Sequence, residues 1–252
     1  MFWIHGGAYT SGSAGGYNGA TIARDGNVIV VGVNYRLGAL GFLASSAAAA
    51  EAGGTTGNYG ILDQQLGLRW VQRNIRAFGG DPRNVTIFGE SAGGHSVCMQ
   101  LTSPLSRGLF AKAISQSGGC VETDLGPRPL ADAEKSSTSF AASVGCTDAA
   151  TALTCLRAKP AADLTKGGGL AESLNLGWVP TIDKRVVREP AGDAIAAGRY
   201  HRVPMIVGTN KNEGTLFLSL TWHLTKGRAA TQADYDEFLG AKQPKEIVDK
   251  IQ

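Results

Sequence analysis

A serine between two glycines has the clearest capacity for chemistry in this chain. Gly89, Ser91 and Gly93 fit the pattern Gly-x-Ser-x-Gly, which stands between an apolar run ending at Phe88 and the apolar segment 97–101. In such a strand-to-helix turn, small flanking residues let the backbone fold tightly, so that the serine hydroxyl projects from the sheet. The pattern predicts that Ser91 is a nucleophile, although it also arises by chance in a chain with 35 glycines.

A second glycine-rich element, residues 5–9, strengthens this interpretation. Its sequence is His-Gly-Gly-Ala-Tyr, and it follows the opening apolar strand and precedes the β-branched run 28–33. A loop at that place can turn backbone N–H groups toward a developing negative charge, and the helix after Ser91 adds its positive dipole end. Taken alone, the loop is explained slightly better as a turn without a task. Two such elements in the right order, each after a strand, favour the catalytic interpretation.

Strands and helices alternate along the chain. The continuous run at 28–33 is typical of a parallel strand that is covered on both faces. Apolar side chains spaced along residues 61–78 fall on one stripe of a helix, which would lay that segment on the sheet. The pattern predicts a mostly parallel α/β sheet covered by helices. Further short strands are expected at 85–88, 110–114 and 203–207, and the helical stripe comprises Ile61, Leu68, Val71, Ile75 and Phe78.

The length favours a single domain over residues 1–252, because one large α/β unit can bury its own core at this size. Residues 44–57 are rich in Ala and Gly and predict a short helix and a mobile loop. Residues from about 125 to 175 interrupt the strand rhythm with polar helical stretches. We expect this segment to form a helical excursion from the sheet.

Composition excludes several classes of function. The formal net charge is +3 without a block of Lys or Arg, so a nucleic-acid partner is not expected. The chain has no apolar run of about 18 residues and does not open on a signal-peptide pattern, so no membrane span is expected. The four cysteines lack Cys-x-x-Cys spacing, and we expect neither a metal nor a cofactor. Nothing in the sequence sets an oligomeric state.

The motifs together resemble the type-B carboxylesterase family, which includes bacterial esterases, cholinesterases and some lipases. Residues 78–93, Phe-Gly-Gly-Asp-Pro-Arg-Asn-Val-Thr-Ile-Phe-Gly-Glu-Ser-Ala-Gly, match the family's nucleophile signature at every position. The resemblance runs from residue 1 to about residue 220 and implies the α/β-hydrolase fold. Similar agreement is seen at residues 34–36 (Asn-Tyr-Arg), 57–60 (Gly-Asn-Tyr-Gly), 116–118 (Gln-Ser-Gly) and 208–214 (Gly-Thr-Asn-Lys-Asn-Glu-Gly).

The resemblance implies a role for particular residues. Ser91 would be the nucleophile, and Glu213, on a loop beyond the 203–207 strand, would be the acid that orients the catalytic histidine. The backbone N–H groups of Gly7, Ala8 and Ala92 would form the oxyanion hole. Most relatives carry glycine at the position of Ala8, so its methyl group would narrow the site. The implied reaction is hydrolysis of a small carboxylic ester through an acyl-enzyme, without a cofactor.

The histidines depart from the family pattern. The chain has four, His5, His95, His201 and His223, and none lies in the family's histidine motif. We expect each of them to be a structural or surface imidazole. The upstream part of the family's sheet is not matched either. The chain is therefore expected to be a fragment, incomplete at both ends and without the general base.

The cysteines suggest a cellular location. Cys146 and Cys155, with Leu156 and Arg157 after them, resemble the family's small disulfide loop, which would contribute roughly 2–3 kcal/mol to stability. Such a bond would imply export to an oxidising compartment. Cys98 and Cys120 are expected to be buried free thiols.

Two alternatives to an active esterase follow from the same resemblance. One is a non-catalytic cholinesterase-like binding module, which typically loses its nucleophile, and here Ser91 and Glu213 argue against it. The other is a truncated product without turnover, which the expected gaps at both edges of the sheet favour.

Overall fold

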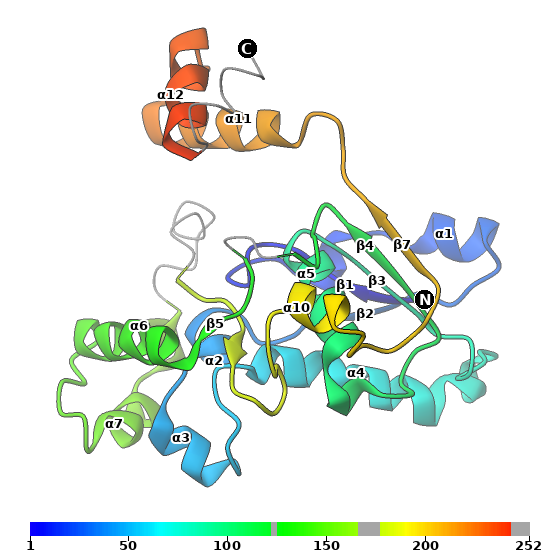
Figure 1. The fold of residues 1–252 in the computed structure, drawn as a ribbon, viewed down its shortest axis with the longest axis horizontal. Coiled ribbons are helices and arrows are strands. Elements are labelled where there is room, and N and C mark those ends of the chain that lie inside the picture. The colour runs from blue at the N-terminus through cyan, green and yellow to red at the C-terminus, as the bar shows by residue number, and fades with distance from the viewer. Residues whose placement is uncertain (122–124, 166–176, 243–252) are drawn as a thin grey trace. The chain divides into compact units, whose positions relative to one another are not determined.

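The computed structural model describes residues 1–121, 125–165 and 177–242 (Figure 1). The chain forms two compact units, Met1–Gly208 and Thr209–Gln252, and each is described by itself. Prediction of one domain for the whole length stays a prediction.

A five-stranded, fully parallel sheet organises the first unit, with strand order β2-β1-β3-β4-β7 (Figure 1). The predicted parallel α/β sheet is thereby confirmed. The strands differ from expectation at their ends, since β1 pairs only with the last part of the 28–33 run and the strand before Ser91 extends to Glu90. The strands are β1 (Phe2–Ile4), β2 (Val31–Val33), β3 (Thr86–Glu90), β4 (Lys112–Gln116) and β7 (Met205–Gly208).

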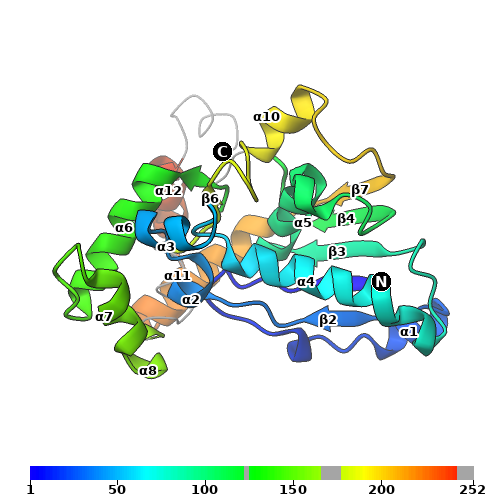
Figure 2. The same cartoon turned by 90° about the horizontal axis from the view of Figure 1, so that it is seen from below.

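Two helices, α4 (Tyr59–Asn74) and α5 (Ala92–Thr102), lie on one face of this sheet (Figure 2). Phe2 and Ile87 point to that face and are buried together with Leu68 of α4 and Val97 of α5. Burial of such side chains contributes about 1.5–3 kcal/mol each, so this layer is the main source of stability around β1 and β3.

Phe78 does not belong to the stripe of α4, and that prediction is wrong. The helix ends at Asn74 and passes into a tighter 3₁₀ turn, η2 (Ile75–Phe78). Since a 3₁₀ turn advances a side chain further round the axis per residue, Phe78 rotates away from the sheet. It is 62% exposed and lies against Trp70, with ring centroids 5.7 Å apart. The other predicted members of the stripe, Ile61, Leu68, Val71 and Ile75, are buried.

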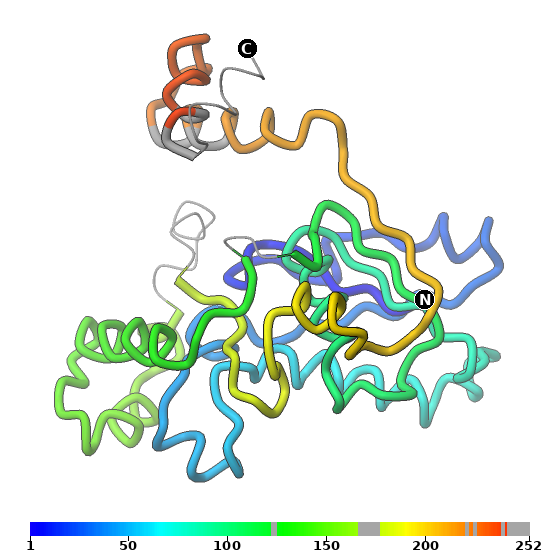
Figure 3. The backbone as a smooth tube through the Cα atoms, in the orientation of Figure 1, coloured from blue at the N-terminus to red at the C-terminus, as the bar shows by residue number. Residues whose placement is uncertain are grey.

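The predicted helical excursion leaves the sheet after β4 and is traced in green in Figure 3. Residues 166–175 of the predicted segment lie outside the described residues. Two short parallel strands, β5 and β6, mark where the excursion departs and returns. The elements are β5 (Arg128–Pro129), α6 (Leu130–Ser143), α7 (Ala152–Ala158), α8 (Ala161–Leu164) and β6 (Thr181–Ile182). Helix α10 (Ala191–Ala196) follows the return.

The short helix predicted within 44–57 is present as α3 (Ser46–Glu51), but the end of that segment is not a loose loop. Thr55 and Thr56 are buried, and the neighbouring Asn58 side chain exchanges two hydrogen bonds with the Thr181 backbone, at 2.7 and 2.9 Å. This amide fixes β6 to the core. The remaining short elements are η1 (Ala14–Gly16), α1 (Ala20–Asp25), α2 (Gly38–Phe42) and η3 (Pro104–Ser106).

Both cysteine pairs are disulfides in the structure. Cys146 is joined to Cys155 beside α7, and Cys98 of α5 is joined to Cys120 in the loop after β4. The expectation that Cys98 and Cys120 are free thiols is therefore wrong. Parallel pairing of β3 with β4 brings the loop after β4 beside α5. Because Cys98 and Cys120 are 22 residues apart in the sequence, their spacing does not predict this proximity.

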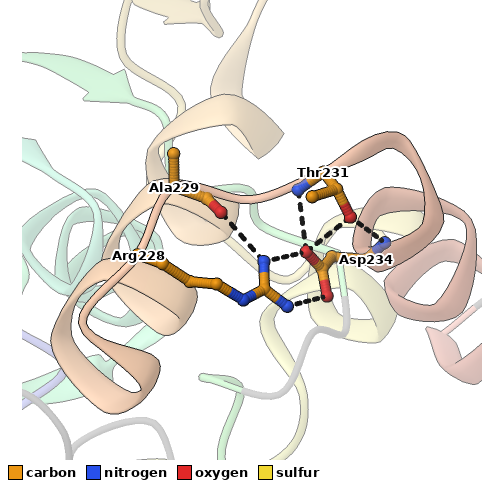
Figure 4. Close-up of polar contacts among 4 residues, drawn as sticks. All are labelled: Arg228, Ala229, Thr231 and Asp234. Atoms are coloured by element: carbon orange, nitrogen blue, oxygen red, sulfur yellow. Dashed lines mark hydrogen bonds and ion pairs between the residues drawn. The ribbon is translucent and has the colours of Figure 1, made fainter.

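The second unit contains two helices, α11 (Glu213–Lys226) and α12 (Gln232–Lys242). Figure 4 shows the turn between them, where Arg228 holds Asp234 by hydrogen bonds of 2.5 and 2.8 Å. Thr231 donates its N–H and its hydroxyl to the same carboxylate, and its hydroxyl oxygen accepts from the Asp234 N–H at 3.3 Å, which caps the start of α12. Arg228 first, and Thr231 with it, hold the pKa of Asp234 well below its usual range. Among the helices that the structure describes, none has the length and apolarity to cross a membrane.

Candidate active site

Ser91 occupies a strained turn between β3 and α5. Its φ of 55° and ψ of −123° lie in a backbone region that residues other than glycine rarely adopt. The Ser91 N–H donates to the Gln116 carbonyl at 2.9 Å, and the Ser91 carbonyl accepts from the His95 N–H at 2.9 Å. The turn is therefore fixed from β4 on one side and from the first turn of α5 on the other, in the strand-to-helix context that the sequence predicts.

Both glycines that flank Ser91 lie so close to neighbouring backbone atoms that no side chain would fit at either position. A Cβ atom at Gly89 would lie 2.4 Å from the Gly93 carbonyl oxygen, and one at Gly93 would lie 2.0 Å from the Ile4 carbonyl oxygen. Gly118, which the sequence did not single out on its own, has the same role, because its Cβ would lie 2.4 Å from the Ser91 carbonyl oxygen. The Gln-Ser-Gly stretch at 116–118 was the signal that could have found it.

The loop after β1 lies directly beside the serine. A Cβ atom at Gly6 would stand 3.1 Å from the Cβ of Ser91. Pairing of Ile4 with Gly89 explains this proximity, because it brings the carboxyl ends of β1 and β3 to the same edge of the sheet. The two predicted elements are thus neighbours in space.

The loop itself has an unusual backbone. Gly7, Ala8 and Tyr9 have φ values of 108°, 51° and 61°. A left-handed conformation at Ala8 costs roughly 1–2 kcal/mol, and the surroundings must supply this energy. Buried Tyr9, whose ring packs on Phe42 with centroids 5.0 Å apart, anchors the end of the run.

The N–H groups of Gly7, Ala8 and Ala92 are the predicted oxyanion donors. Within the described part of the chain, none of them donates a hydrogen bond to another residue. Ala92 is the first residue of α5, so its N–H is one of the helix's unsatisfied donors and carries the positive end of the helix dipole. The arrangement leaves these donors available for an anionic oxygen next to Ser91.

A buried polar network behind the serine joins α5 to α4, and the sequence reasoning missed it. The Gln64 side chain donates to the Ser96 hydroxyl at 3.1 Å and accepts from Gln100 at 3.0 Å. Gln65 continues the network to Gln100 at 3.2 Å. Gln64 and Gln65 stand three and four residues after Ile61, within the apolar stripe of the predicted helix. Two polar side chains at such positions were the signal available in the sequence. The network fixes α5 against rotation and thereby fixes Ser91 at its start.

Three of the histidines lie outside the oxyanion loop. Burial lowers the pKa of His95 on α5, and a hydrogen bond with the Gly119 backbone opposes that shift. The His201 ring donates from Nε2 to the Ser103 carbonyl at 2.7 Å, which gives it a structural role. His223 is exposed in the last turn of α11. His201 and His223 therefore fit the structural and surface roles that the sequence predicts for them.

Glu213 follows β7 as predicted, but it is the first residue of helix α11 and not part of a loop. Its Oε1 accepts a hydrogen bond from the Asn210 N–H at 2.7 Å. Glu213 belongs to the second unit and Ser91 to the first, so its role as the acid stays a prediction. Among the described residues, no group of His, Cys, Asp and Glu side chains could hold a metal ion.

Comparisons with known proteins find relatives along most of this chain. The chain is 42% identical to para-nitrobenzyl esterase of Bacillus subtilis over 229 residues, covering 87% of this chain and 44% of that protein. It is 40% identical to human bile salt-activated lipase, with coverage of 93% and 32%, and 36% identical to human Neuroligin-2, with coverage of 98% and 30%.

A solved structure described as a thermophylic PNB esterase superposes with a TM-score of 0.76 at 32% identity, covering all of this chain and 50% of that one. The chain therefore spans about a third to a half of the length of these relatives. The carboxylesterase family profile matches residues 1–250. The chain belongs to the carboxylesterase family.

Proposed function

We propose that the complete protein containing this chain hydrolyses carboxylic esters through an acyl-enzyme on Ser91. One observation carries the proposal. A serine held in a strained turn at the N-terminus of α5 lies beside a loop in which, among the described residues, the N–H groups of Gly7 and Ala8 donate to no other residue. Two of the similar proteins, bile salt-activated lipase and para-nitrobenzyl esterase, are named for the hydrolysis of esters.

The reaction follows from these groups. Ser91 Oγ attacks the ester carbonyl carbon while an imidazole, oriented by Glu213, removes the hydroxyl proton. The carbonyl oxygen becomes negatively charged and accepts hydrogen bonds from the oxyanion loop and Ala92. Each such donor is worth about 10²–10³-fold in turnover. The imidazole then protonates the departing alcohol, and water releases the acid from Ser91 by the same steps.

A covalent probe tests this proposal. In the complete protein, a fluorophosphonate should attach to one residue only, because such probes require an activated nucleophile beside oxyanion donors. Mass spectrometry of peptides should locate the adduct on Ser91, and heat-denatured protein should remain unlabelled. An adduct on another residue, or equal labelling after denaturation, would refute the assignment.

The second candidate is a cholinesterase-like module that binds without turnover. Retention of Ser91 in a strained conformation argues for the enzyme, because strain of this kind persists only where the surrounding structure maintains it. The probe separates the two candidates, since a binding module has no reason to activate the serine.

Export to an oxidising compartment is the location we propose. Cys98–Cys120 and Cys146–Cys155 support it, because such bonds persist mainly in secreted proteins. Peptide mapping without reduction should find both pairs joined in protein made in an oxidising compartment. Free alkylation of all four cysteines in folded protein would remove this support.

A further inference from the structure

His5 opens the oxyanion loop and is almost completely buried, at 1% exposure. Its Nδ1 lies 2.8 Å from the carbonyl oxygen of Gly6. Since a carbonyl oxygen can only accept a hydrogen bond, Nδ1 must carry the proton. Within the described part of the chain, Nε2 has no hydrogen-bond partner, and burial lowers the pKa of His5, with its bond to Gly6 opposing the shift. The ring therefore acts on the loop as a hydrogen-bond donor through Nδ1.

The acceptor of this hydrogen bond belongs to a particular peptide group. The Gly6 carbonyl and the Gly7 N–H are two ends of the same planar unit, and the described residues contain no cis peptide bond. A trans peptide points its carbonyl and its N–H in opposite directions. Whatever holds the Gly6 oxygen therefore also sets the direction of the Gly7 N–H.

This peptide needs external restraint. It joins two glycines, and glycine reaches positive and negative φ with similar ease, so the plane could rotate at little cost. In the opposite orientation, Gly7 would present no donor to the substrate oxygen. A hydrogen bond from a buried, immobile ring selects one of the two orientations.

The surroundings keep the ring and its acceptor in place. The His5 ring stacks on Tyr35 with centroids 4.4 Å apart and planes 18° apart, and the Tyr35 hydroxyl donates to the His5 carbonyl at 2.8 Å. Gly12 packs over the hydrogen bond. Its Cβ would lie 2.5 Å from the Gly6 oxygen and 2.7 Å from His5 Nδ1. A glycine at position 12 thus leaves room for this contact.

We propose that His5 is a positioning residue, which aims the Gly7 N–H at the oxyanion by holding the Gly6 carbonyl. This role rests on the proposed function, because only ester hydrolysis gives the loop a negatively charged substrate oxygen to which Gly7 can donate a hydrogen bond. It assigns His5 no contact with substrate and no proton transfer.

The experiment uses the complete protein and a pair of substitutions matched in shape. His5→Leu removes the donor, whereas His5→Asn offers a side-chain amide N–H at about the position of Nδ1. We expect His5→Leu to lower kcat about 100-fold with KM changed less than threefold, as for the loss of one oxyanion donor. His5→Asn should recover at least tenfold of that loss. His5→Phe, which keeps a ring against Tyr35, should behave like His5→Leu and serves in its place if the leucine variant does not fold.

Two further measurements separate positioning from general destabilisation. Affinity for a trifluoromethyl ketone, whose adduct with Ser91 carries an anionic oxygen, should fall in parallel with kcat/KM. Ser137→Ala is the control, because it removes a buried hydroxyl that accepts from the Ala44 N–H at 2.9 Å, far along the chain from the loop. It should lower the unfolding temperature and leave kcat unchanged.

The outcomes are distinct. Equal kcat in His5→Leu and the wild type, or equal losses in the Leu and Asn variants, would overturn the positioning role. So would a loss of kcat that Ser137→Ala reproduces at the same change in stability. Wild-type turnover that disappears in Ser91→Ala upholds the proposed function whatever the His5 variants do. A wild type without Ser91-dependent turnover would overturn both proposals.

Discussion

Replacement of Ser91 by alanine in the complete protein is expected to lower kcat for p-nitrophenyl butyrate about a millionfold. The substitution removes the oxygen that forms the acyl bond and leaves the donors of Gly7, Ala8 and Ala92 in place. Binding of the ester should therefore persist. An ester analogue that binds without reacting with Ser91 should keep its dissociation constant within a few-fold. The residual rate measures what the oxyanion loop achieves with water as the nucleophile.

Stability should change little in this variant. Alanine has the same Cβ as serine and meets the same strain at a φ of 55°, and the backbone hydrogen bonds to Gln116 and from His95 do not involve the side chain. Ser139→Ala is a suitable control, since its exposed hydroxyl bonds only to Lys135 on α6. Turnover by Ser91→Ala at more than about one thousandth of the wild-type rate would exclude Ser91 as the nucleophile.

Local patterns sufficed to predict the architecture and the proximity of loop 5–9 to Ser91. Uninterrupted β-branched runs separated by a helical stripe predict a parallel sheet, because only strands covered on both faces can be apolar throughout. The order of strand, loop 5–9, strand and Ser91 then predicts their meeting, since neighbouring parallel strands present their carboxyl ends at one edge. The register of Ile4 with Gly89 shows this geometry directly.

Features that depend on long-range packing could not be predicted in the same way. The bond between Cys98 and Cys120 requires knowledge that β4 lies next to β3, which no local spacing encodes. The exposure of Phe78 depends on where α4 changes to a 3₁₀ turn, and helix ends are poorly specified by periodicity. The hydrogen bonds between the Asn58 side chain and the Thr181 backbone join residues that are distant in sequence, so no local pattern predicts them.

Glycines in this site report packing more than flexibility. Gly6, Gly93 and Gly118 each stand where a Cβ would fall within about 3 Å of the turn around Ser91 or of β1. Their spacing was visible in the sequence, but the atoms they approach were not. The site is therefore defined by close backbone contacts among β1, β3, β4 and α5, and its chemistry depends on those contacts as much as on the serine.

The last prediction concerns these 252 residues expressed alone. We expect them to hydrolyse p-nitrophenyl butyrate about a millionfold more slowly than the complete protein, because none of the four histidines lies in the family's histidine motif. The contacts of two histidines support this expectation. His5 donates to Gly6 within the loop, and His201 donates to Ser103. Without a base, Ser91 is an ordinary alcohol and a weak nucleophile at neutral pH.

The measurement compares the purified, folded chain with its Ser91→Ala and His223→Ala variants, with folding checked by circular dichroism. His223 is the informative position, because it is exposed on α11, ten residues beyond Glu213. Equal slow rates in all three proteins are the expected result. Enzyme-like turnover that disappears in both variants would show that His223 is the base and that the catalytic machinery is contained in this chain. Turnover lost only in Ser91→Ala would instead direct attention to His95, which lies one helical turn beyond Ser91 on α5.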